Sequence, residues 1–131
     1  MSEIPVGLKY TTDHEWLREQ DDGTVEVGIT DHAQVSLGEL VFVELPEDDT
    51  SVNSGDAGAV VESVKAASDV YIPLSGTIVA TNQALVDSPE LVNTDPYGEG
   101  WLFRIKPDTP AQLDELLGSE DYERFVAELH D

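Results

Sequence analysis

Short apolar runs separated by turn residues recur along most of the chain. Between residues 24 and 29 apolar positions alternate with polar ones, which is typical of a half-buried strand. The Asp22-Gly23 pair before this run is a turn signal, so residues 10–30 predict a hairpin. The same period of two predicts further strands at residues 40–45, 77–81 and 101–106.

The strand predicted at residues 40–45 has an apolar face formed by Val41, Val43 and Leu45. The opposite face includes Phe42. The residues that follow, from Pro46 to Gly55, are rich in acidic and turn-forming types, so they predict a loop.

Helix signals are short and lie at the margins of these strands. Asp31 with Gln34 three residues later resembles a capping box, and Gly38 is suited to end that helix. A second short helix is predicted at residues 88–93, with Ser88 as its cap and proline at its first position.

The period changes to 3.6 near the C-terminus. Thr109-Pro110 predicts the start of a short helix that Gly118 ends, and Ser119 can cap another. In that last helix apolar residues recur on one face, which we expect to cover the strand core. These residues are Tyr122, Phe125, Val126 and Leu129. Many strands with marginal helices predict a β-rich domain, and no linker or domain boundary is recognisable.

The most informative stretch surrounds Lys65. The β-branched runs at residues 59–61 and 70–72 flank a centre of small and polar residues, which predicts a hairpin. Lys65 lies near the tip of that hairpin, where its long side chain is open to a modifying enzyme. In an arbitrary hairpin, an unmodified lysine in solvent would be the commoner interpretation.

Charge narrows the choice of partners. The 131 residues include 28 Asp and Glu but only 6 Lys and Arg, giving a net charge of −22. Such a surface repels nucleic acid and anionic lipid, so we expect neither as a partner. The chain has no cysteine, which excludes disulfides, thiolate metal sites and a redox thiol of its own. Its three histidines are far apart in sequence, and we expect no metal site.

The N-terminal residues lack a basic start and an apolar segment, so a secretory signal is not indicated. No apolar run approaches the length of about 18 residues that a membrane-spanning helix needs. We therefore expect a cytoplasmic protein.

Several dispersed motifs together resemble the glycine cleavage system H protein family, over about residues 8–129. The match at the predicted hairpin is Glu62-Ser63-Val64-Lys65-Ala66-Ala67-Ser68-Asp69, which resembles the family's lipoyl-attachment hairpin. The other matching pieces are Tyr10 with His14-Glu15-Trp16, the run from Gly28 to Gln34, Asn93, Pro96-Tyr97-Gly98 and Gly100-Trp101-Leu102. Motifs in the right order across the whole chain are more specific than one short pattern.

The resemblance implies a barrel-sandwich hybrid fold of the lipoyl/biotinyl type, with short marginal helices and a C-terminal helix. Residues 1–131 would form a single lipoyl-carrier domain, with a core at about 24–106 and a helical cover at about 109–130. The resemblance also implies lipoic acid bound covalently to Lys65 through an amide. Biotin is disfavoured because Val64 and Ala66 stand where biotinyl domains typically place methionine.

The resemblance further implies a polar cleft that holds the amine of an aminomethyl-loaded arm. By position its residues are Asp13, Glu15, His32 and Asp69, and a cationic amine there needs carboxylate partners. Aspartate at position 13 departs from the serine often found in the family. Glu62 and Asp69 flank the tip and are candidates for recognition by the modifying enzyme.

The implied function is a carrier and not an enzyme, since no catalytic motif is present. Its partners would be glycine decarboxylase, aminomethyltransferase, dihydrolipoamide dehydrogenase and a lipoate-attaching enzyme, each meeting a monomeric carrier. Two alternatives stay open. One is a related carrier or lipoyl-relay protein for another pathway, and the other is an unmodified structural module of the same fold.

The acidic coat suggests a halophilic adaptation, with an ordinary acidic protein that binds a basic partner as the alternative. If adaptation is the cause, the melting temperature should rise from low to molar KCl, because salt screens repulsion between surface carboxylates. Thermal melts in graded KCl measure this. An unchanged melting temperature would favour the ordinary acidic protein.

Overall fold

The computed structural model describes residues 4–129, which form two antiparallel sheets with helices at their margins. The sheet-rich architecture with a C-terminal helix confirms the predicted fold class, and the described residues form no closed barrel. The larger sheet runs in the order β1 (Lys9–Tyr10), β2 (Glu15–Glu19), β3 (Val25–Ile29), β9 (Phe103–Pro107), β8 (Gly76–Thr81), β5 (Ser51–Val52). The smaller sheet runs in the order β4 (Leu40–Glu44), β6 (Ala57–Ser63), β7 (Ala67–Tyr71).

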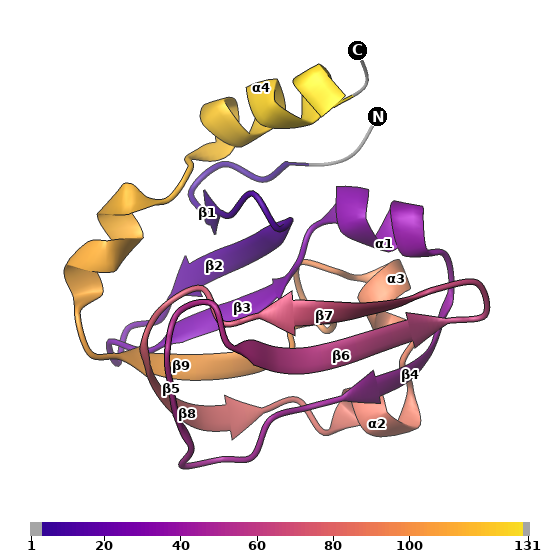
Figure 1. The fold of residues 1–131 in the computed structure, drawn as a ribbon, viewed down its shortest axis with the longest axis horizontal. Helices are drawn as coiled ribbons and strands as arrows, with labels where there is room; N and C mark the ends of the chain where they lie inside the picture. The colour runs from indigo at the N-terminus through magenta and orange to yellow at the C-terminus, as the bar shows by residue number, and fades with distance from the viewer. Residues whose placement is uncertain (1–3, 130–131) are drawn as a thin grey trace.

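The helical segments are short, apart from the last one. They are α1 (Asp31–Leu37), α2 (Ala84–Asp87), α3 (Leu91–Thr94), a 3-10 segment η1 (Pro110–Glu115) and α4 (Ser119–Leu129). In Figure 1 the turn between β6 and β7 lies at the same end of the molecule as α1 and α3. None of the helices in residues 4–129 is long and apolar enough to cross a bilayer.

The main core lies between the two sheets. Each sheet turns one face of alternating apolar side chains inward, as the period-two pattern predicts. The larger sheet contributes Val27, Phe103 and Ile105, and the smaller contributes Val43, Ala59, Val61 and Val70, all in one buried cluster.

Strand β3 differs from the predicted half-buried strand, because all five of its residues are buried. Glu26, which the alternation places toward solvent, is opposite Arg18 on β2 and Arg104 on β9. Arg18 Nη1 donates to Glu26 Oε1 at 3.1 Å, and Arg104 Nη2 donates to Oε2 at 2.9 Å. The two guanidinium groups in turn lie over the rings of Trp16 and Trp101. Cross-strand pairing therefore lets a carboxylate be buried at this position.

Strand β4 corrects the predicted face of residues 40–45. A register shift between Leu40 and Phe42 breaks the alternation, as a β-bulge does. Leu40 and Val43 are consequently buried, whereas Val41 and Phe42 are exposed. The loop predicted at residues 46–55 also contains a short strand, β5, which pairs with β8.

The helix starts also differ from the predictions. The N-cap of α1 is Thr30, whose Oγ1 accepts from the Ala33 amide, while Asp31 Oδ1 instead accepts from the Gln34 side chain. Gly38 ends this helix as predicted, at φ 85°. The helix predicted at residues 88–93 is replaced by two single turns, α2 and α3, and Ser88 ends the first of them.

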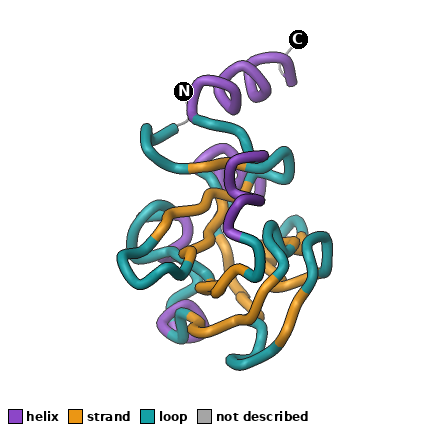
Figure 2. Tube along the Cα trace, turned by 90° about the vertical axis from the view of Figure 1, so that its left-hand side faces the viewer, coloured by secondary structure: helices purple, strands orange, loops and turns teal. Residues whose placement is uncertain are grey.

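Helix α4 forms where the 3.6-residue period predicts it, but it does not cover the main core. Figure 2 shows it at one end of the molecule, beyond the strands. Tyr122 and Val126 pack in a separate buried cluster with Leu8, Tyr10 and Trp16. The Tyr10 and Tyr122 rings stack with centroids 4.7 Å apart. The helix therefore closes the β1–β2 end of the larger sheet.

Replacing Glu26 with alanine should lower the free energy of unfolding by about 2 kcal/mol, since it leaves two arginines without their shared partner. The arginine side chains are each 37% exposed, so solvent reduces the loss below that of a fully buried triad. Urea denaturation measures it. The control is Asp121→Ala, which removes an exposed ion pair to Arg124 and should change stability by less than about 0.5 kcal/mol. Equal losses in the two variants would contradict this account.

Candidate functional site

Lys65 lies at the tip of the β6–β7 hairpin, as the sequence predicts, and its side chain is exposed. The turn is closed by the Ser63 amide, which donates to the Ala66 carbonyl at 2.7 Å. Ser63 Oγ accepts from the Ala66 amide at 3.1 Å, so one small side chain braces the turn from within. The lysine backbone is therefore fixed while its side chain projects from it.

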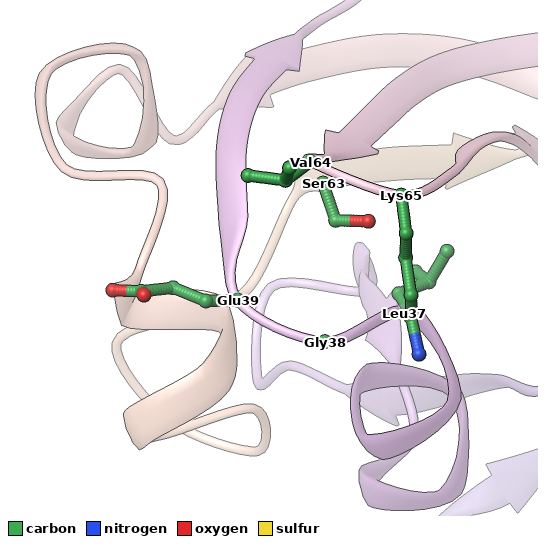
Figure 3. A pocket seen from close by; sticks show the side chains of 6 residues that line it. All are labelled: Leu37, Gly38, Glu39, Ser63, Val64 and Lys65. Atoms are coloured by element: carbon green, nitrogen blue, oxygen red, sulfur yellow. The ribbon is translucent and has the colours of Figure 1, made fainter.

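The Lys65 stem extends toward the junction between α1 and β4 (Figure 3). A Cβ placed on Gly38 would lie 3.4 Å from Lys65 Cε and 3.9 Å from Nζ, so the stem passes directly over this glycine. Beside it lies a hollow of about 310 Å³ with apolar walls from Leu37 and Val64. The positive φ favours glycine at position 38, whereas a Cβ there would make only ordinary contact with the stem.

Asn93 fixes the backbone on which the Lys65 stem lies. Its Nδ2 donates to Gln34 Oε1 at 2.9 Å and to the Gly38 carbonyl at 2.8 Å. Its Oδ1 accepts from the Leu40 amide at 2.9 Å. One side chain on α3 thus holds the end of α1 and the start of β4 together. Sequence reasoning identified Asn93 as part of the resemblance and as the end of a predicted short helix, and its spacing from residues 34–40 gave no signal of this contact.

A second group of polar residues surrounds Glu15 at the start of β2. Glu15 is only 2% exposed. Its Oε1 accepts from the Thr11 hydroxyl at 3.2 Å, whereas its buried Oε2 has no hydrogen-bond partner. Burial, and to a smaller extent the charge of Asp13, raises the pKa of the Glu15 carboxyl to about 8. The Thr11 hydroxyl and the Tyr71 peptide group oppose the shift, although Tyr71 makes no hydrogen bond of normal geometry to Oε2.

His14 joins this group to His32 and to the C-terminal helix. The His14 and His32 rings lie 4.6 Å apart, although 18 positions separate the residues in sequence. His14 Nδ1 is hydrogen-bonded to the Tyr122 hydroxyl at 2.8 Å, and that hydroxyl is also bonded to Thr30 Oγ1 at 2.8 Å. Burial lowers the pKa of His14, with a further lowering from His32, while Asp13 opposes both.

Of the four residues predicted for the arm cleft, Asp13 lies close enough to Glu15 to act on its charge, and His32 contacts His14, which precedes Glu15 in the chain. Asp69 is exposed in the middle of β7, between the tip and Tyr71, whose peptide group adjoins Glu15. Asp69 thus lies on the route along β7 from Lys65 to Glu15. Sequence reasoning missed Thr30 and Tyr122, because only folding places them beside His14. It also missed Thr11, which is close to Glu15 in sequence but belongs to no recognisable motif.

The remaining candidate, Glu62, is half-buried on β6 opposite Ala67, directly below the tip. Within residues 4–129, no cluster of three or more potential metal ligands forms, despite the contact between His14 and His32. The arrangement thus offers an exposed amine at one end of the hairpin and a buried, incompletely hydrogen-bonded carboxyl group near the other.

Comparison with known proteins matches this geometry to one family. The profile described as "Glycine cleavage H-protein" matches residues 8–129. The chain is 61% identical over 123 residues to the glycine cleavage system H protein of Psychrobacter sp. (strain PRwf-1), covering 94% of this chain and 98% of that protein. It is 58% identical over 128 residues to that of Shewanella loihica, covering 98% and 99%. A crystal structure of a glycine cleavage system H protein from Mycobacterium marinum superposes with a TM-score of 0.86 at 43% identity, covering 95% of this chain and 99% of that one.

The raised pKa of Glu15 predicts a pH-dependent loss of stability. In the unfolded chain this carboxyl loses its proton near pH 4.5, but the native protein retains it up to about pH 8. The free energy of unfolding should therefore fall as pH rises from about 4.5 to 8. Glu15→Gln has no carboxyl group to titrate. The free energy of unfolding of this variant minus that of the unchanged protein should therefore increase by on the order of 3 kcal/mol between pH 4.5 and pH 8.

Urea titrations at a series of pH values measure the difference between the two proteins. The titration of His14 is present in both and cancels in the comparison. Glu44→Gln, at an exposed position of β4, serves as the control and should show no such trend. A difference that does not change with pH would contradict a native pKa near 8.

Proposed function

The chain belongs to the glycine cleavage H-protein family, and we propose that it is a carrier that bears a lipoyl group on Lys65. The observation that carries the proposal is the display of Lys65 at the tip of a braced hairpin. Lys65 is also the only lysine or arginine between Arg18 and Arg104. The strands and helices around the β6–β7 turn that come from residues 19–103 therefore contribute no other amine side chain.

The residues around Lys65 fit the attachment of lipoic acid. The ε-amino group would form an amide with the carboxyl group of lipoic acid, with loss of its positive charge. The hollow walled by Leu37 and Val64 offers apolar surface to the root of an aliphatic chain. Once attached, lipoic acid supplies a dithiolane, which this cysteine-free chain cannot provide itself. We propose that the enzyme that attaches lipoic acid recognises Glu62 and Asp69, which lie on either side of the tip.

We propose that the group around Glu15 holds the amine of the aminomethyl-loaded arm. Glu15 Oε2 is a buried oxygen without a hydrogen-bond partner, and a cationic amine could donate to it once the carboxyl group has lost its proton. Asp13 is exposed and acts electrostatically on Glu15, so it is placed to receive the amine at the surface. His32 borders the group through His14, and Asp69 lies on the route along β7. Because Glu15 is covered in this structure, its cover must open for the amine to enter.

The proposed cycle has three partners. Glycine decarboxylase transfers an aminomethyl group to the carrier, aminomethyltransferase passes on the one-carbon unit, and dihydrolipoamide dehydrogenase restores the oxidised carrier. A carrier that visits three enzymes in turn needs transient contacts, and we propose that it does so as a monomer. A rigid hairpin under a long flexible arm favours this exchange, because tethering raises the effective concentration of the reactive sulfur at each site.

Replacing Lys65 with arginine tests the attachment directly. The guanidinium group keeps the charge and stem but cannot be acylated in the same way, so transfer from glycine should be abolished while the fold is retained. Exchange of labelled bicarbonate into glycine with glycine decarboxylase measures transfer, and intact mass measures attachment. The control is Lys106→Arg, an exposed lysine on β9, which should keep both the added mass and the activity. Transfer by the Lys65→Arg protein would remove the assignment.

A further inference from the structure

An exposed apolar surface begins at the root of Lys65 and runs along β4. Val64, next to Lys65 at the tip, is 91% exposed. Val41 and Phe42 on β4 are 56% and 45% exposed. We call these three residues the Phe42 surface. Val41 and Phe42 are adjacent on β4, and Val64 is two residues beyond Glu62, the residue opposite Phe42. Neighbouring exposed apolar side chains are typical of a binding site.

The bulge in β4 creates this surface. A regular strand would turn Val41 and Phe42 to opposite faces, so one of them would be buried. The register shift between Leu40 and Phe42 instead leaves both exposed while Leu40 and Val43 remain in the core. Bulges are frequent next to functional sites because they redirect side chains in this way.

The pairing of β4 with β6 places the surface beside the attachment lysine. Leu40 is opposite Ser63 and Phe42 is opposite Glu62, so the exposed part of β4 adjoins the last residues before the tip. Glu39 and Val64 line the same hollow as Lys65. Figure 3 shows Val64 turned toward the β4 side while Lys65 turns toward α1. An enzyme that receives the arm of Lys65 would therefore meet the Phe42 surface at the same time.

The acidic residues around the Phe42 surface indicate what charge a partner needs. Glu39 and Glu44 are exposed beside Val41 and Phe42, and Glu62 is half-buried opposite Phe42. Acylation of Lys65 would remove the only cationic side chain of residues 19–103 other than histidine. A second copy of this chain would bring the same acidic rim against itself and be repelled, as would an anionic membrane.

We propose that the Phe42 surface is the docking site for the glycine decarboxylase partner, which fits it with an apolar pocket rimmed by Arg or Lys. The apolar contact holds the complex, and the acidic rim steers the encounter. This inference rests on the proposed carrier function and adds to it the surface that determines affinity.

The experiment uses the full-length lipoylated protein, with attachment verified by intact mass for each variant. The rate of glycine-dependent transfer is measured at varied carrier concentration with glycine decarboxylase. Phe42→Ser should raise the KM for the carrier about 10-fold with kcat unchanged, since a central aromatic contact is lost. Phe42→Leu, which keeps apolar area, should restore most of the affinity. The matched control is Val79→Ser on β8 of the other sheet, 38% exposed, which should change KM less than about 2-fold.

Glu44→Lys tests the acidic rim without altering the apolar residues, and it should also raise KM. If the unchanged carrier is active and neither Phe42→Ser nor Glu44→Lys alters KM, the docking site is wrong and the carrier function stands. Equal effects of Phe42→Ser and Val79→Ser would also overturn the docking site, since they would indicate a general loss. If the unchanged lipoylated protein accepts nothing from glycine decarboxylase, the proposed function fails and the docking site fails with it.

Discussion

The hairpin that carries Lys65 depends on burial of its inner face against the larger sheet. Two strands joined by a tight turn are barely stable alone in water, so the tip can hold a fixed position only if the strands below it are anchored. Ala59, Val61 and Val70 provide that anchor in the core shared with Val27, Phe103 and Ile105. The outer face of the hairpin then remains free for polar residues, and its tip projects into solvent. The same packing thus holds the strands of the hairpin in place and leaves the Lys65 side chain at the tip in solvent.

A second constraint fixes the backbone beneath the lysine stem. Asn93 bonds the end of α1 to the start of β4, and the lysine stem lies over Gly38 between them. The same junction leads into the β4 bulge, which exposes Val41 and Phe42. The path of the lysine and the exposure of the Phe42 surface are therefore set by one short segment, residues 38–42. The proposed attachment site and the proposed docking site are therefore connected by one continuous stretch of backbone.

The Glu15 group depends on parts of the chain that are distant in sequence. Tyr122 on α4 bonds both His14 and Thr30, so the C-terminal helix fixes the ring of the histidine that precedes Glu15 in the chain. Glu15 is buried without a full set of hydrogen bonds, which is costly for folding and is tolerated mainly where function requires it. Its raised pKa keeps the carboxyl largely protonated near neutral pH, so the arrival of a cationic amine would favour release of that proton.

The sequence by itself determined most of the strands, the central hairpin with Lys65 at its tip, the C-terminal helix and the family resemblance. These features follow from the spacing of apolar residues and from turn-forming residues, both of which depend on residues that are close together in the sequence. Tertiary structure alone decided that Glu26 is buried, because its two arginines come from strands eight positions before and 78 positions after it. It also decided the β4 bulge, the cap at Thr30 and the contact of His14 with Tyr122. Each of these features depends on a partner residue that folding brings close. The free energy of that contact outweighs the preference set by the pattern of apolar and polar residues nearby in the sequence.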